Sequence, residues 1–322
     1  MPLTHSLVQL EHFGACDASA AVPVGPALFV VANDEDNVLR VYHSDIPGPP
    51  VQSFDLTPCL APDPKREEAD IEGGTWLGDR VYWITSHARN RNGKKKPARY
   101  QFFAVEFVLR EDDLELRCVG EPYTRLLDDM LADPRLERYG LKAASELPPK
   151  EKGALNIEGL CATPDGRLYV GFRNPIPEGR ALVIPLENPA ELVEGTAAAR
   201  FGEPLLLDLG GLGIRSIKYW ARRRTYMIVA GHFGSDEPGE GENVPSVLYR
   251  WSGDAGEPPI RVEGIDLSYF NPEAQVIYPQ QDSSFQLLSD DGNADVGGKK
   301  CKDLDDAGQK RFRSRWLSLD PF

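Results

Sequence analysis

Residues 70–84 read DIEGGTWLGDRVYWI, and residues 156–170 read NIEGLCATPDGRLYV. Both stretches carry a glutamate in a short segment that a turn connects to a strongly apolar run. The turns, at Gly78-Asp79 and at Pro164-Asp165-Gly166, are typical of β-hairpins. A hairpin unit that recurs along a chain predicts a repeat architecture, in which each unit buries its apolar face against the next one.

Three further segments match the same pattern. The residues at its third position are Ser19, Glu72, Glu158, Arg215 and Glu273. They are spaced by 53, 86, 57 and 58 residues, and by 68 through the two termini. A four-stranded propeller blade needs about 40–45 residues, so these steps fit blades with loop insertions. The sequence therefore predicts an all-β chain that forms a single β-propeller domain over residues 1–322, with both termini closing one blade.

We expect five blades, or six if the 86-residue step conceals another unit. An irregular β-sandwich with accidental self-similarity is the other alternative. A helical insertion near residues 124–140 explains the long step, because apolar residues recur there at helical spacing, and Pro134 is expected to interrupt the helix.

Composition limits the function classes. The formal net charge is −14, which disfavours nucleic acid and anionic membranes as partners. No apolar run is long enough to span a bilayer, and residues 1–20 lack the basic start of a secretory signal. The five cysteines are scattered without a C-x-x-C motif, which favours free thiols in a reducing cytoplasm.

The stretch over residues 70–94, together with residues 156–174 and 32–42, resembles an uncharacterised bacterial family, catalogued as domain of unknown function 3616. The segment EGLCATPDGRLYV is also similar to the propellers described as esterase-like phytases. These resemblances imply a β-propeller and bring no established reaction with them.

Matched positions of the repeats are expected to meet on the propeller axis, because innermost strands line the central channel. A second set of polar residues follows the third-position residues at offsets of 15 or 17. Its members are Asp34, His87, Arg173, His232 and Asp290. Charged side chains are rarely buried unless they are paired or bind a ligand, so the two sets predict a polar axial pocket.

Clustered carboxylates invite a hard cation such as Ca²⁺. The expected ligands are Glu72, Glu158, Glu273, Asp34 and Asp290. Asp34 and Asp290 each begin or lie in a short Asp/Asn-rich segment, at residues 33–37 and 290–295. The second segment lacks the bidentate glutamate of an EF-hand, so a loop of that type is excluded.

A neutral imidazole beside a carboxylate is a suitable general base near neutral pH, so His87, His232 and Glu158 are the candidate catalytic residues. Arg173, Arg215 and Arg89 are the candidate substrate-binding residues, because guanidinium groups hold phosphate or carboxylate in a fork. Arg89 begins the loop 89–99, in which six of eleven residues are basic.

These features predict a hydrolase of an anionic small molecule, a phosphoester or a lactone, with Ca²⁺ as the candidate cofactor. No motif for a nucleotide or an organic cofactor is present. The alternative is a non-catalytic propeller that binds a ligand or a protein partner, whose axial charges form a closed ring of salt bridges. The sequence leaves open whether the protein is an enzyme, and it identifies no protein partner.

Overall fold

The computed structural model describes residues 8–110, 113–234 and 245–319. Residues 1–7, which belong to the segment in which no secretory signal is predicted, lie outside the described residues.

Five antiparallel sheets of four strands make up the fold. From the innermost strand outward, the first sheet contains β2 (Ala20–Val24), β3 (Leu28–Ala32), β4 (Val38–His43) and β5 (Gln52–Asp55). The second sheet contains β6 (Ile71–Leu77), β7 (Arg80–Thr85), β8 (Phe102–Arg110) and β9 (Asp113–Tyr123). The third sheet contains β10 (Asn156–Ala162), β11 (Leu168–Asn174), β12 (Ala181–Leu186) and β13 (Leu205–Leu207). The fourth sheet contains β14 (Gly213–Trp220), β15 (Thr225–Gly231), β16 (Val247–Trp251) and β17 (Ile260–Arg261). The fifth sheet contains β18 (Pro272–Val276), β19 (Ser284–Ser289), β22 (Arg311–Ser318) and β1 (Gln9–Phe13).

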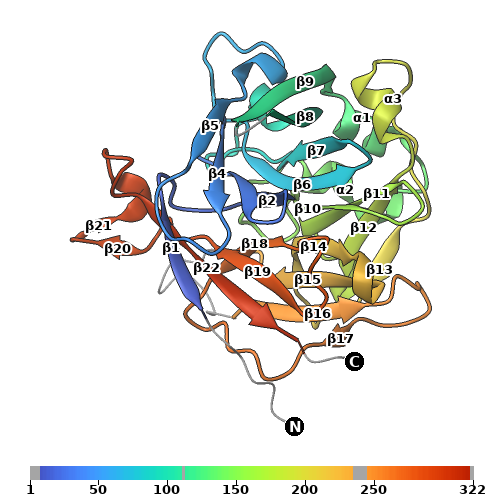
Figure 1. The fold of residues 1–322 in the computed structure, drawn as a ribbon. Helices are drawn as coiled ribbons and strands as arrows, with labels where there is room; N and C mark the ends of the chain where they lie inside the picture. Colours follow the sequence, from blue (N-terminus) through green and yellow to red (C-terminus); the bar gives the residue numbers. More distant parts are fainter. Residues whose placement is uncertain (1–7, 111–112, 235–244, 320–322) are drawn as a thin grey trace.

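The five sheets surround a common centre, and their first strands lie nearest to it (Figure 1). Each inner strand contacts the next one in the order β2, β6, β10, β14, β18, and β18 contacts β2 again. Apolar residues fill the space between neighbouring sheets. The chain is therefore a five-bladed β-propeller, as the repeats predict.

The fifth blade contains both ends of the described chain. Strand β1 pairs with β22 in an antiparallel register that places Leu10 opposite Ser314. These strands lie side by side at the outer edge of the blade (Figure 1).

Short helices occupy the connections between strands. Helices α1 (Leu126–Ala132) and α2 (Leu141–Ala144) lie between the second and third blades, and α3 (Pro189–Val193) lies between β12 and β13. Helix α1 ends at Ala132, before Pro134, so the predicted helical insertion and its interruption are confirmed. A small hairpin, β20 (Asp295–Val296) and β21 (Lys299–Lys300), projects from the fifth blade (Figure 1).

A register shift occurs at the same place in four of the five inner strands. The shifts fall at Glu72, Glu158, Arg215 and Glu273. A β-bulge leaves one residue out of the ladder and redirects its side chain. The bulges therefore explain how four charged side chains turn away from the blade and toward the axis.

A glycine follows the bulge in the two most similar repeats. A Cβ atom at Gly73 would lie 2.8 Å from the Leu160 Cβ atom of the next blade. A Cβ atom at Gly159 would lie 3.0 Å from the Gly171 Cα atom. The glycine in D-I-E-G and N-I-E-G is therefore required by close packing around the axis.

Two disulfides correct the prediction of free thiols. Cys16 is bonded to Cys301 and Cys59 to Cys118, while Cys161 is a buried free thiol. The sequence did not reveal the pairs because their members are 285 and 59 residues apart. Disulfides persist in oxidising environments, so they do not support the predicted cytoplasmic location.

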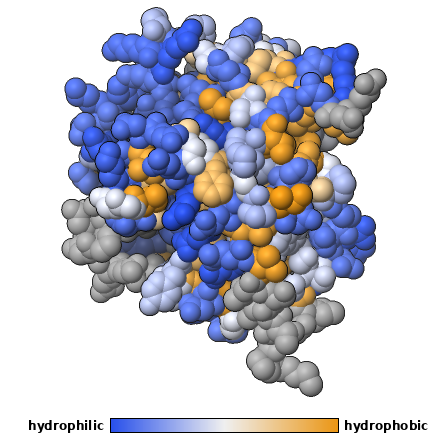
Figure 2. All heavy atoms as spheres, turned by 60° about the vertical axis from the view of Figure 1, so that its left-hand side comes forward, coloured by the Kyte–Doolittle hydropathy of each residue, from blue (hydrophilic) through white to orange (hydrophobic). Residues whose placement is uncertain are grey.

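Hydrophilic residues cover most of the side of the molecule shown in Figure 2, and hydrophobic residues form small separate groups there. In the described part of the chain, no helix has the length and apolar character needed to cross a bilayer.

Candidate functional site

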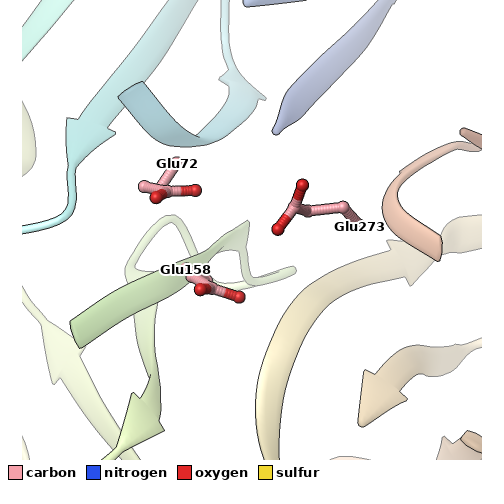
Figure 3. A group of neighbouring side chains, drawn as sticks. All are labelled: Glu72, Glu158 and Glu273. Carbon is pink, nitrogen blue, oxygen red and sulfur yellow. The ribbon is translucent and has the colours of Figure 1, made fainter. Parts of the chain in front are cut away.

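Three bulged glutamates meet at the propeller axis. Glu72, Glu158 and Glu273 each offer one carboxylate oxygen, and these oxygens all lie within 4.8 Å of one another. Their side chains come from three blades and turn toward one shared space (Figure 3). The three residues are 8%, 2% and 7% exposed, so the carboxylates are close together and largely removed from water.

Two of the three carboxylates have cationic partners. The Arg173 guanidinium donates a hydrogen bond of 2.8 Å to Glu158 Oε1. The Arg215 guanidinium donates one of 2.6 Å to Glu273 Oε1, and its Nε lies 3.8 Å from Glu158 Oε2. Burial raises the pKa of Glu158, while Arg173 and Arg215 oppose that rise.

Glu72 differs from the other two. Within residues 8–110, 113–234 and 245–319, its carboxylate has no hydrogen bond and no ion pair. Burial raises the pKa of Glu72 well above its usual range, and the neighbouring Glu158 carboxylate raises it further. A buried carboxylate without a partner carries a large desolvation penalty, which either a proton or a bound cation can relieve.

Above the trio lies a cavity of about 600 Å³ at the start of the inner strands. Nine carboxylates and five basic side chains line it. Asp34, Asp290 and Arg173, three of the predicted site residues, are among them. Of the basic residues that line the cavity, Arg91 and Lys150 lie in loops. The cavity therefore has carboxylates at its base and positively charged side chains on the surrounding loops.

Three cavity residues were not predicted. Asp17, Asp70 and Asn156 occupy the first position of the repeat motif, two residues before the third-position residue. Alternate residues of a strand point to the same side, so this spacing was a signal that could have found them. The Asn156 Oδ1 atom is buried and has no hydrogen-bond partner within the described residues.

Asp17 and Asp34 form a carboxyl pair. Their side chains are close enough to hydrogen-bond to each other, and the Asp34 N–H donates to Asp17 Oδ1 at 3.4 Å. Burial and the nearby Asp70 carboxylate raise the pKa of Asp34 to about 8. Burial and the Asp34 carboxylate also raise the pKa of Asp17. The pair is therefore expected to share a proton near neutral pH.

Asp70 adopts an unusual backbone conformation at the cavity wall. Its φ angle is +60°, in the left-handed region, and its Oδ2 accepts a hydrogen bond of 2.9 Å from Arg99. Burial raises the pKa of Asp70, and Arg99 counteracts the rise. Backbone strain at non-glycine residues is concentrated at functional sites, which is consistent with a binding role for this wall.

The structure does not bring His87 to the cavity. The imidazole is fully buried, its Nδ1 hydrogen-bonds to the Thr85 carbonyl, and its ring packs edge-on against Tyr100. Burial lowers the pKa of His87 to about 4. A positive φ of +51° turns the chain at this residue, so the matched register position does not face the axis as expected.

Three other predicted residues lie beside or below the cavity. His232 lines an adjacent hollow of about 400 Å³ and accepts a hydrogen bond from the Gly234 N–H. Arg215 is 2% exposed and forms the ion pairs described above, so it is a counterion of the glutamates. Its role in substrate binding stays a prediction. Arg89 donates to the carbonyls of Ser145 and Gly93, which holds it away from the cavity that its neighbour Arg91 lines.

A family model described as "Protein of unknown function (DUF3616)" matches residues 111–255. This match confirms the resemblance over residues 111–255, which include the stretch 156–174 but not the stretches 32–42 and 70–94. It brings no activity with it, and the similarity to esterase-like phytases stays a hypothesis. No curated protein matches the chain by sequence.

Solved structures share the fold at low identity. A GH43 β-1,3-galactosidase has 8% identity and a TM-score of 0.51, over 98% of this chain and 60% of that one. Glutaminyl cyclase from Myxococcus xanthus has 10% identity and a TM-score of 0.47, over 99% and 100%. The PQQ-bound aldose sugar dehydrogenase from Streptomyces coelicolor has 12% identity and a TM-score of 0.42, over 98% and 99%. At 8% identity and a TM-score of 0.51, the galactosidase match indicates the fold alone.

Proposed function

We propose that the axial cavity binds a divalent cation, with Ca²⁺ as the first candidate, and that the protein hydrolyses an anionic small molecule there, a phosphoester or a lactone. The Glu72 carboxylate carries this proposal. It is buried, it lies beside two other carboxylates, and it has no partner among the described residues. A purely structural ring of salt bridges leaves this carboxylate unexplained, because the ion pairs that Arg173 and Arg215 form within the trio are with Glu158 and Glu273.

The donor set suits a hard cation. Ca²⁺ takes six to eight oxygen ligands, and carboxylates and amide carbonyls are its usual protein ligands. Glu158 Oε2 and Asn156 Oδ1 are buried atoms without hydrogen-bond partners in the described chain, and both residues line the cavity. Together with Glu72 and Glu273 they offer four ligating groups, so coordination positions remain for water and for a substrate oxygen.

The charge distribution suits an anionic substrate that bridges the floor and the rim. Arg91, Lys150 and Lys302 line the cavity in loops outside the inner strands. These side chains can hold the anionic group of a substrate, while a bound cation would polarise its phosphoryl or carbonyl oxygen.

The Asp17–Asp34 pair can move the proton. With a pKa of about 8, the Asp34 carboxyl titrates near neutral pH, which suits a general base. In the proposed step, a water oxygen forms a bond to phosphorus or to the carbonyl carbon, and the water proton passes to the Asp34 carboxylate. The bond to the leaving oxygen then breaks, and that oxygen takes up a proton.

Isothermal titration calorimetry with Ca²⁺ tests the cation site. We expect Glu72→Gln to weaken Ca²⁺ binding by about 100-fold or more, because loss of even an outer-shell partner costs about 10–100-fold. Glu68→Gln is the matched control, because Glu68 lines the same cavity but pairs with Arg99 outside the trio. Equal Ca²⁺ affinity of the wild type and Glu72→Gln would overturn the site.

Hydrolysis is tested separately with 4-nitrophenyl phosphate and dihydrocoumarin, with and without Ca²⁺. We expect Ca²⁺-dependent turnover that Asp34→Asn abolishes while Ca²⁺ still binds. Tight Ca²⁺ binding without turnover of either class of ester would refute the hydrolase and favour a non-catalytic ligand-binding propeller.

A further inference from the structure

The inner strands form a second cavity at their opposite ends. This cavity has a volume of about 490 Å³, and its wall includes residues from the ends of all five inner strands. Examples are Pro23 of β2, Trp76 of β6, Ala162 of β10, Tyr219 of β14 and Gln275 of β18. The carboxylate cavity lies at the starts of the same strands, so the two cavities occupy opposite ends of the axis.

The second cavity has the opposite chemistry. Most of its wall is apolar or aromatic, with Trp76, Tyr219 and Ile277 as large members. Within the described part of the chain, its charged lining residues are Lys218 and Arg222, and no acidic residue lines it. In a protein with a net charge of −14, a hollow that is lined by two cations and no carboxylate is complementary to an anion.

Lys218 lies in this cavity without a carboxylate partner among the described residues. Its Nζ donates a hydrogen bond to the Gly74 carbonyl, which is the one hydrogen bond that the ammonium group forms within the described chain. Burial lowers the pKa of Lys218 to about 8, and the nearby Cys161 thiol, whose own pKa burial raises to about 12, opposes the change. A buried ammonium of this kind is stabilised by an anion that replaces its lost hydration.

We propose that this second cavity binds a small apolar carboxylate. The carboxylate pairs with the Lys218 ammonium, and the apolar body lies against Trp76 and Tyr219. The site takes a ligand of a different class from the cation and the substrate of the axial carboxylate cavity, and it does not depend on them.

Calorimetric titration with 4-hydroxyphenylacetate tests the proposal, with phenylacetate and tyramine as comparison ligands. We expect 4-hydroxyphenylacetate and phenylacetate to bind saturably, because both carry the carboxylate, and the cation tyramine not to bind. Lys218→Met should weaken binding of 4-hydroxyphenylacetate at least tenfold. Lys142→Met is the matched control and should bind as the wild type, because Lys142 is exposed on helix α2 and does not line this cavity.

A pH series on the wild type keeps the test decisive if Lys218→Met fails to fold. The affinity for 4-hydroxyphenylacetate should fall as the pH rises through about 8, where the Lys218 ammonium loses its proton. The Cys161 thiol near Lys218 keeps its proton in that range, because burial raises its pKa to about 12. Arg222, Tyr219 and Tyr278 also line the cavity, and burial raises the pKa of the Tyr278 hydroxyl as well. Absence of saturable binding, or equal binding by Lys218→Met, would overturn the proposal. Glu72→Gln should leave this binding unchanged, which separates it from failure of the cation site.

Discussion

Replacing Arg215 by methionine should destabilise the propeller strongly. Arg215 is 2% exposed, and its guanidinium lies 2.6 Å from Glu273 Oε1 and 3.8 Å from Glu158 Oε2. Methionine preserves most of the volume but removes the positive charge. The variant therefore leaves two buried carboxylates without this counterion, and breaking a buried pair from one side costs about 3–5 kcal/mol.

The expected shift in melting temperature follows from the chain length. An unfolding entropy of about 2.1 cal/mol/K per residue gives roughly 0.7 kcal/mol/K for 322 residues. A loss of about 3–5 kcal/mol then lowers Tm by roughly 4–7 °C. The measurement is thermal unfolding followed by circular dichroism, in buffer that contains a chelator.

Two comparisons make the result specific. Arg200→Met removes an exposed partner of Glu191 and should leave Tm unchanged within error. Saturating Ca²⁺ should restore part of the stability of Arg215→Met, because a cation between Glu158 and Glu273 replaces the lost charge. A Tm within about 2 °C of the wild type, without Ca²⁺, would refute the view that Arg215 neutralises the trio.

Two further predictions concern the fold. The double variant Cys59→Ser/Cys118→Ser removes a bond that closes a loop of 59 residues, which should cost about 4 kcal/mol and lower Tm by roughly 6 °C in a calorimetric scan. An equal Tm with and without reductant would contradict this. In cation-free buffer, stability to urea should fall as pH rises from about 4 to about 8, because folded Asp34, with a pKa of about 8, keeps a proton that the unfolded chain releases. Asp34→Asn should reduce this dependence without removing it, because the pKa values of Asp17, Asp70, Glu72 and Glu158 are also raised. An unchanged slope would contradict the assignment.

The sequence predicted the blade arrangement because the inner strands repeat a short, regular pattern. In D-I-E-G and in N-I-E-G, the glutamate forms a β-bulge and the following glycine makes a close packing contact. Glu72 and Glu158 could therefore be aligned from the sequence alone. The meeting of these residues with Glu273 follows directly from closure of the ring.

The positions of the remaining site residues are determined by loops, so the register of the repeated strands does not predict them. His87 occupies the repeat position that Arg173 occupies in β11, yet it lies after the end of β7, and a left-handed backbone conformation directs its imidazole into the core. Asp17 and Asp70 belong to the repeat motif, but whether they line the cavity depends on the distance of their loops from the propeller axis. The disulfide partners could not be paired from the sequence, because nothing local brings Cys16 near Cys301.

The pairing of β1 with β22 and the Cys16–Cys301 bond lie at the same junction of the ring. Both join the N-terminal part of the chain to its C-terminal part, one by backbone hydrogen bonds and the other covalently. Opening the propeller at this junction therefore requires breaking a disulfide bond in addition to the backbone hydrogen bonds between β1 and β22. Partial opening under heat or mechanical load is consequently directed to the other boundaries between blades, where side-chain packing, hydrogen bonds such as that from Ala162 to Thr75, and ion pairs such as Arg215–Glu273 resist it.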